Sequence, residues 1–138
     1  MIAIIDDNES IQDSLCDLIE SVGFEAKCFG SAKAFLESDW YSRVGCLIVD
    51  VRIPKMSGLE LQAKLKQGQC NVPIIFMTAF DDAELRTEAM KEGAIEFLAK
   101  PFDHQFLLRI LRCTLDRQTY NVGSTRFAIA SSSARASP

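Results

Sequence analysis

Short apolar runs alternate with stretches of helical periodicity along most of this sequence. Five candidate strands occupy residues 2–5, 24–29, 45–50, 72–78 and 94–99, and the second of them, FEAKCF, alternates like a half-buried strand. The third contains the letters CLIV, which are apolar throughout, as in a strand that is covered on both faces. Two parallel strands must be joined by a crossover connection, which is usually a helix. A helix after each strand therefore indicates parallel pairing. The pattern predicts an α/β fold in which five βα units place helices on both faces of one parallel sheet.

The segments between these runs carry helix signals. In the first segment, apolar residues recur at helical spacing from Ile11 to Val22. Asn8 or Ser10 can cap the start of this helix, and Gly23 can end it. Four more helices are predicted at residues 32–39, 58–68, 82–92 and 102–117.

Length and charge limit what the chain can be. Its 138 residues, 48% of them hydrophobic, suffice for one core, and a second folded domain is not expected. The 15 Lys and Arg residues are outnumbered by 19 Asp and Glu residues, which gives a formal net charge of -4. Because no overall positive field would attract nucleic acid, direct DNA binding by this chain is disfavoured.

The N-terminus carries no targeting signal. The stretch MIAIIDDNES lacks a basic region followed by a long apolar core. No apolar run approaches the ~20 residues that a membrane-spanning helix needs. We therefore expect a cytoplasmic protein that does not bind a membrane.

The cysteines are odd in number and far apart in the sequence. They form no CxxC pair, and only one histidine, His104, could join them at a metal. We interpret them as small buried apolar residues in a reducing compartment. They are Cys16, Cys28, Cys46, Cys70 and Cys113.

The composition changes near the C-terminus. Residues 120–138 are rich in Ser and Ala, end in Pro and show no convincing period. We therefore divide the chain into one domain, residues 1–119, and a linker or disordered tail, residues 120–138. A tether that leads to an output domain is an equally open reading of the tail.

Polar side chains stand where the apolar runs end. Asp6 and Asp7 follow the first run and Asp50 ends the third, while Thr78 ends the fourth and Lys100 follows the fifth. The carboxyl ends of parallel strands share one edge of the sheet, where such folds bind ligands. Three carboxylates there would repel one another unless a cation neutralised them, and oxygen ligands without Cys or His favour Mg²⁺. Alternatively, the first two acids could simply favour a helix start.

Thr78 and Lys100 would complete a phosphoryl-binding site. Lys100 would supply a fixed positive charge and Thr78 a hydroxyl donor opposite the acids. Phosphoryl transfer depends mainly on such positioning and charge neutralisation. Asp50 is then the candidate nucleophile, since an aspartate can accept a phosphoryl group as an acyl phosphate. In the simpler alternative, Thr78 bonds to backbone at a strand end and Lys100 is a solvated surface cation.

Four motifs in this sequence resemble the receiver domain of two-component response regulators. IIDDNES is similar to the acidic pair of that family, and LIVDVRIPKMSGLEL is similar to its phosphoacceptor strand and loop. FMTAF resembles the strand that ends in the switch hydroxyl, and FLAKPF resembles the lysine–proline turn. The resemblance extends over residues 2–119. It implies a flavodoxin-like, doubly wound (βα)5 fold with strand order 2-1-3-4-5.

The resemblance implies a set of phosphorylation and metal residues. Asp50 would take a phosphoryl group from the phosphohistidine of a sensor histidine kinase. Asp6 and Asp7 would bind Mg²⁺ together with Asp50 and the backbone carbonyl of Arg52. Such a chain accepts a phosphoryl group and is not an enzyme that turns over an external substrate.

The resemblance also implies a switch. Thr78 and Lys100 would bind the phosphoryl oxygens, after which Thr78 would move toward the phosphate and Phe97 would turn inward behind it. The surface of the fourth helix, fifth strand and fifth helix would then change, and such domains commonly dimerise there. From the residues alone, Phe97 in its apolar strand is more often a core side chain, and its switch role rests entirely on the resemblance.

Other features follow from the same resemblance. Arg52 and Phe80 lie at the mouth of the site, where they would control how fast water hydrolyses the acyl phosphate. Pro101 would follow a cis peptide bond, and His104 has no assigned role. The motifs are most similar to LuxR-type receivers, which precede a helix-turn-helix DNA-binding domain. The chain would then be a stand-alone receiver or a transcription regulator without its output half.

Three other functions fit the sequence less well. A phosphatase with an aspartyl nucleophile would need a second acid two residues after Asp50, where Arg52 stands. Sustained turnover of an external phosphate ester would distinguish a phosphatase or nuclease. A flavin carrier needs a phosphate loop without the acids of DDNE. An interaction module without phosphorylation usually lacks one of the site residues, and all of them are present here.

Overall fold

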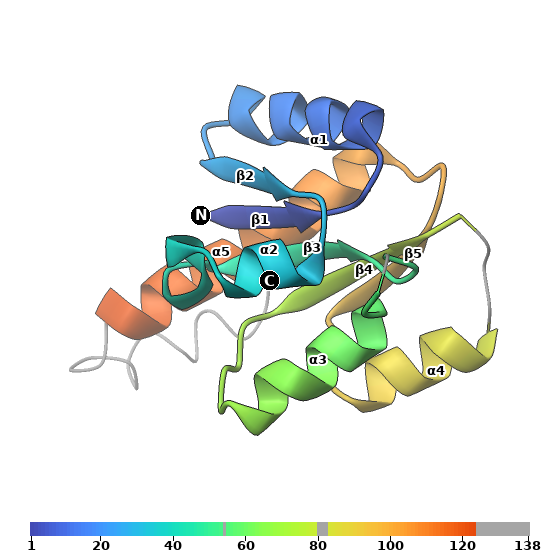
Figure 1. The fold of residues 1–138 in the computed structure, drawn as a ribbon. Helices are drawn as coiled ribbons and strands as arrows, with labels where there is room; N and C mark the ends of the chain where they lie inside the picture. The colour runs from blue at the N-terminus through green and yellow to red at the C-terminus, as the bar shows by residue number, and fades with distance from the viewer. Residues whose placement is uncertain (54, 80–82, 124–138) are drawn as a thin grey trace.

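Five parallel strands form one sheet in the order β2-β1-β3-β4-β5 (Figure 1). The computed structural model describes residues 1–53, 55–79 and 83–123, the last of these, 117–123, as helical backbone. This topology confirms the predicted fold class. The strands are β1 (Ile2–Ile5), β2 (Ala26–Phe29), β3 (Cys46–Asp50), β4 (Ile74–Thr78) and β5 (Glu96–Ala99).

Five α-helices and one 3-10 turn connect these strands. The predicted helix at residues 32–39 is shorter than expected, because the Ser38 hydroxyl accepts a hydrogen bond from the Trp40 N–H and starts a 3-10 turn. The last helix continues six residues beyond the expected end at residue 117 and reaches Gly123. The helices are α1 (Glu9–Ser21), α2 (Ala32–Leu36), η1 (Asp39–Ser42), α3 (Gly58–Gln67), α4 (Ala83–Lys91) and α5 (His104–Gly123).

Side chains at the helix starts fix where the site loops end. Of the two caps that the sequence allows for α1, the structure uses Asn8, whose side chain accepts a hydrogen bond from the Ile11 N–H at 3.2 Å. The loop after β3 ends at Ser57, which forms a reciprocal capping box with Glu60. The polar edge of the sheet is therefore bounded by well-capped helices.

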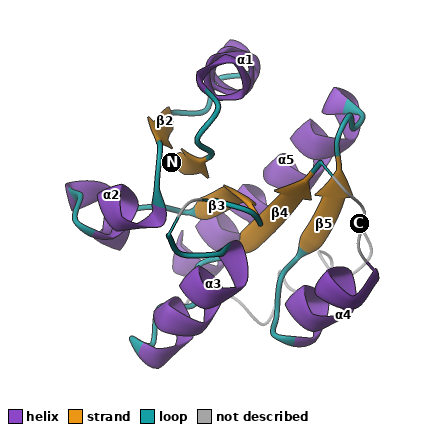
Figure 2. Cartoon of the chain, turned by 45° about the vertical axis from the view of Figure 1, so that its right-hand side comes forward, coloured by secondary structure: helices purple, strands orange, loops and turns teal. Residues whose placement is uncertain are grey.

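The sheet separates two apolar layers. On one face, α1 and α5 cover Ile4 and Ile48, and on the other face α2, α3 and α4 cover Ile5 and Val49. Figure 2 shows these two groups of helices on opposite sides of the strands. The central strand β3 is buried from Cys46 to Val49, as its unbroken apolar run predicts. Among the described helices, none is long and apolar enough to cross a membrane.

The cysteines differ from the expectation of small buried residues that lie far apart. Cys46 is buried, but Cys113 is exposed and Cys16, Cys28 and Cys70 are half-buried. The Sγ atoms of Cys16 and Cys28 lie 3.0 Å apart, although twelve positions separate them in the sequence. The reason is the crossover, which folds α1 back over β2.

Candidate functional site

Lys100 joins two carboxylates at the carboxyl edge of the sheet. Its Nζ atom donates to Asp6 Oδ2 at 3.1 Å and to Asp50 Oδ2 at 2.9 Å. The Asp6 side chain is 1% exposed, that of Asp50 13% and that of Lys100 18%. The strands β1, β3 and β5 thus bring together three of the predicted site residues. Lys100 lies 94 positions after Asp6 and 50 positions after Asp50 in the sequence.

The second oxygen of each carboxylate is held by local backbone. Asp6 Oδ1 accepts a hydrogen bond from the Asn8 N–H, and Asp50 Oδ1 accepts one from the Arg52 N–H, both at 2.9 Å. Each carboxylate therefore bonds its own loop with one oxygen and Lys100 with the other. This arrangement fixes the orientation of both side chains before any ligand arrives.

A residue that the sequence reasoning did not single out supports this loop. The Gln12 side-chain amide, on the first turns of α1, donates to the backbone carbonyls of Asp6 and Phe29. It therefore links the carboxyl ends of β1 and β2. These contacts arise because α1 places Gln12 above the loop. No motif in the sequence indicates a role for this residue.

Burial and charge shift the ionisation of this group in a consistent direction. Burial raises the pKa of Asp6 above its ordinary 3.8, and the bonds from Asn8 and Lys100 offset this only in part. Burial lowers the pKa of Lys100, but its hydrogen bonds and charge interactions with Asp50 and Asp6 outweigh that effect, and the net shift is upward. One ammonium group is therefore fixed as a cation, while the buried Asp6 carboxylate remains incompletely compensated.

The site residue Thr78 lies deeper than the carboxylates. It is fully buried at the end of β4, and its carbonyl accepts a hydrogen bond from the Lys100 N–H at 2.7 Å. Phe97 on β5 is 1% exposed, and its ring centroid lies 6.2 Å from that of Phe76. The Phe97 ring thus lies inward in this structure, and its predicted movement stays a prediction.

Arg86 is a second residue that sequence reasoning missed. From α4, its Nη1 atom donates to the Phe97 carbonyl at 2.9 Å, and its guanidinium lies 5.1 Å from the centre of the Phe97 ring. The Phe97 N–H bonds to the Glu96 side chain at 3.1 Å. Side chains thus satisfy both backbone groups of Phe97 on the edge strand.

The remaining predicted metal ligands stand at the rim. Asp7 and Arg52 are exposed. Within the described parts of the chain, no three His, Cys, Asp or Glu side chains are close enough to hold a metal ion. The donors nevertheless suit a hard cation, because Asp6 and Asp50 offer carboxylate oxygens to a shared positive charge. Lys100 occupies this position between them.

The loops around the site require special backbone. Lys55 has φ of 68°, and the peptide bond between Lys100 and Pro101 is cis, as the resemblance implied. The N–H of Gly58 donates to the Val51 carbonyl at 2.9 Å, which closes the loop after β3. Phe80, a predicted control on hydrolysis, lies outside the described residues.

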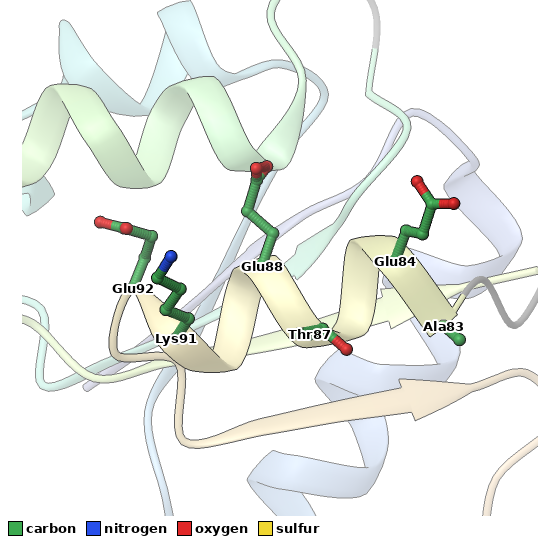
Figure 3. A pocket seen from close by; sticks show the side chains of 6 residues that line it. All are labelled: Ala83, Glu84, Thr87, Glu88, Lys91 and Glu92. Atoms are coloured by element: carbon green, nitrogen blue, oxygen red, sulfur yellow. The ribbon is translucent and has the colours of Figure 1, made fainter.

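A hollow of about 420 Å³ lies elsewhere, on one side of α4. Glu84 and Glu88 project outward from the same side of this helix, and Lys91 and Glu92 lie at its C-terminal end (Figure 3). Neither Asp6 nor Asp50 lines it. The described residues that line the hollow belong to α4 or directly follow it, and none of the predicted site residues is among them.

The doubly wound sheet and the polar group at its carboxyl edge define a flavodoxin-like protein with a candidate phosphoryl and cation site. The sequence matches the family model of the response regulator receiver domain over residues 2–112. The chain belongs to this family, which serves two-component systems.

Known relatives agree with this assignment. The chain is 43% identical over 115 residues to the response regulator protein TmoT of Ectopseudomonas mendocina, covering 83% of this chain and 52% of TmoT. It is 40% identical over 114 residues to the transcriptional regulatory protein FixJ of Bradyrhizobium diazoefficiens, covering 83% of this chain and 56% of FixJ. These regulators confirm the resemblance to LuxR-type receivers. The chain spans about half the length of the curated relatives it matches.

A solved structure shows the same fold. The crystal structure of full-length FixJ from B. japonicum superposes with a TM-score of 0.78 at 38% sequence identity. The match covers 89% of this chain and 61% of that chain. The similarity therefore extends over the whole receiver unit.

Proposed function

We propose that this chain is a phosphorylatable switch in which Asp50 accepts a phosphoryl group from the phosphohistidine of a sensor histidine kinase. The observation that carries the proposal is the Lys100 ammonium, which contacts both Asp6 and Asp50. A carboxylate Oδ of Asp50 attacks phosphorus, an acyl phosphate bond forms, and the phosphorus–nitrogen bond to histidine breaks. The chain then acts as a phosphoacceptor with only intrinsic autophosphorylation and autodephosphorylation.

Each residue has a distinct task in this proposal. Lys100 neutralises charge on the incoming phosphoryl oxygens, because its ammonium already lies 2.9 Å from Asp50 Oδ2. The Arg52 N–H donates to Asp50 Oδ1 at 2.9 Å and so fixes the orientation of the carboxylate. The Thr78 hydroxyl would bind a phosphoryl oxygen from the end of the neighbouring strand β4. Hydrolysis would be tuned by Arg52 and Phe80 at the mouth.

Mg²⁺ would be held by Asp6, Asp7, Asp50 and the carbonyl of Arg52. When bound, it would supply positive charge that offsets the acids and the phosphoryl oxygens. The raised pKa of Asp6 supports this assignment, because an incompletely compensated buried carboxylate favours an added cation.

The output surface is proposed to lie on α4, β5 and α5. Among the described residues, the large apolar side chains that remain exposed are Met90 on α4 and Phe106 on α5, at 40% and 37%. Thr78 and Phe97 connect the site to β5 and, through Arg86, to α4. We infer that phosphorylation changes this surface and favours a homodimer, which regulates transcription through an output domain outside this chain.

The same proposal assigns the rest of the chain. Residues 1–119 would form the receiver domain, and residues 120–138 a linker or tail. DNA contact would belong to the output domain, in line with the net charge of -4. The protein would meet its kinase in the cytoplasm without binding a membrane.

Intact-protein mass after incubation with acetyl phosphate tests the chemistry. We expect a gain of one phosphoryl group that requires Mg²⁺ and is absent in Asp50→Asn. Asp17→Asn removes an exposed carboxylate of α1 and should be phosphorylated normally. A folded chain that gains no phosphoryl group would contradict the proposal and favour an unphosphorylated interaction module. An equal gain in Asp50→Asn would contradict the assignment of Asp50 as the acceptor.

Light scattering during size-exclusion chromatography tests the output. Acetyl phosphate with Mg²⁺ should increase the molar mass of the native chain toward that of a dimer. Met90→Glu should reduce this increase while phosphorylation of Asp50 continues. A phosphorylated chain that stays monomeric at high concentration would contradict the dimerisation step alone.

A further inference from the structure

Two cysteine thiols meet between α1 and the edge strand β2. Cys16 Sγ and Cys28 Sγ lie 3.0 Å apart, within S–H···S hydrogen-bond reach. Cys28 Sγ also contacts the Gln12 carbonyl at 3.4 Å. A disulfide bond needs the two sulfurs at about 2.05 Å, so each sulfur has to move by only about half an ångström.

Oxidants can reach this pair from solvent. Both residues are half-buried, whereas Cys46 is buried in the centre of the sheet. β2 is an edge strand and pairs only with β1 in the described sheet, and both cysteines pack at the margin of the apolar layer under α1. The other two thiols, Cys70 and Cys113, stand elsewhere and have no sulfur neighbour in the described structure.

We propose that Cys16 and Cys28 form a reversible intramolecular disulfide, which fastens α1 to β2 when the chain meets a two-electron oxidant such as hydrogen peroxide. Disulfides that persist are rare in reducing compartments, but transient redox-sensing ones occur there. The inference does not depend on the proposed phosphorylation.

The reaction balances with peroxide as the oxidant. One thiolate attacks a peroxide oxygen, an S–O bond forms, the O–O bond breaks and water leaves after protonation. The second sulfur attacks the resulting sulfenic acid, the S–S bond forms, the S–O bond breaks and a second water leaves. The two sulfurs together lose two electrons, and the peroxide gains two.

The surroundings of Cys28 disfavour the thiolate form of this residue. Burial raises the pKa of Cys28 to about 12, and its hydrogen bond with Cys16 and the negative charges of Asp13 and Glu20 act in the same direction. Cys28 therefore stays a neutral thiol at physiological pH.

The link would restrain a helix that also supports the candidate site. Gln12 lies one turn before Cys16 on α1, and its side-chain amide joins the carbonyls of Asp6 and Phe29. Fixing Cys16 to β2 therefore limits the movement of α1 relative to the ends of β1 and β2. The disulfide would close a loop of about twelve residues, which stabilises the fold mainly by restricting the unfolded chain.

Tryptic mapping tests the proposal directly. Trypsin cleaves after Lys27 and Lys33, so Cys16 and Cys28 fall in separate peptides, 1–27 and 28–33. After peroxide treatment and alkylation under denaturing conditions, we expect these two peptides to be joined, with the loss of two hydrogen atoms, and separated by dithiothreitol. The background variant Cys70→Ser/Cys113→Ser removes the two other thiols that are not buried and should give the same product.

A melting experiment gives the second readout. Oxidation should raise Tm by about 10 °C in the native chain and in the background variant. Cys16→Ser and Cys28→Ser should show no such increase in Tm. If either variant folds poorly, tryptic mapping still tests it, because the joined peptides should be absent. The proposal is wrong if peptides 1–27 and 28–33 stay separate while Cys113 is oxidised, or if the joined product forms without any change in Tm.

Discussion

Arg86 holds Phe97 at two points, with its guanidinium 5.1 Å from the ring centre and its Nη1 atom 2.9 Å from the carbonyl oxygen. The contacts fasten α4 to the edge strand β5. They also favour the inward position of the ring, because an outward rotation would lose the cation–π contact. Arg86 is therefore placed to link the candidate site with the proposed output surface.

Arg86→Ala is expected to lower the free energy of unfolding by about 1–2 kcal/mol, since it removes a cation–π contact and a hydrogen bond to backbone. Urea denaturation measures this change. Arg109→Ala removes an exposed arginine of α5 and should change stability by less than about 0.5 kcal/mol. Equal losses in the two variants would show that the Phe97 contacts contribute nothing specific.

Gly58→Ala is expected to destabilise the fold by about 2 kcal/mol, because a Cβ at this position would lie 2.7 Å from a ring carbon of Phe76 and 3.0 Å from the Val51 Cα. Gly30→Ala is the matched control, since a Cβ there meets nothing within 4 Å. Thermal melting of both variants measures the difference. If the two variants melt together, the close approach of α3 to β4 does not require a glycine.

In metal-free buffer, Lys100→Met is expected to lower the free energy of unfolding by about 3 kcal/mol. The substitution leaves Asp6 and Asp50 facing each other without a counter-charge. Added Mg²⁺ should then raise Tm more in this variant than in the native chain. Lys66→Met breaks the exposed pair of Lys66 and Glu92, whose side chains are 52% and 47% exposed, and should lower Tm far less than Lys100→Met does. A Mg²⁺ response no larger than that of Lys66→Met would argue against a cation site.

The effect of Asp6→Asn on Tm is expected to be more favourable near neutral pH than in acid. Because burial raises the pKa of Asp6 above 3.8, the folded state binds its proton more tightly than the unfolded state. This contribution is fully present below 3.8 and is lost as pH rises through the folded pKa. The asparagine never ionises, so the difference in Tm between variant and native chain should rise with pH in metal-free buffer. Asp17→Asn should show no such trend, and a flat or falling difference for Asp6→Asn would contradict the argument.

The sequence alone determined the order and type of the main elements. Apolar runs such as Cys46–Val49 predict buried parallel strands, and the acids and lysine at the ends of the runs predict where a polar edge forms. Helix ends were predicted where a local signal exists, as at Asn8. They differed where a competing local bond intervened, as at Ser38, which turns the chain after Leu36.

Only the tertiary structure decided which side chains meet. Lys100 reaches both Asp6 and Asp50 because β5, β1 and β3 end at one edge, and no local pattern specifies which oxygens it contacts. The contacts of Gln12 with two strand ends, of Arg86 with Phe97, and of Cys16 with Cys28 likewise arise from helices packing over strands distant in sequence. Periodicity records which face of a helix is apolar, but the partner of each side chain on that face depends on how the layers are stacked.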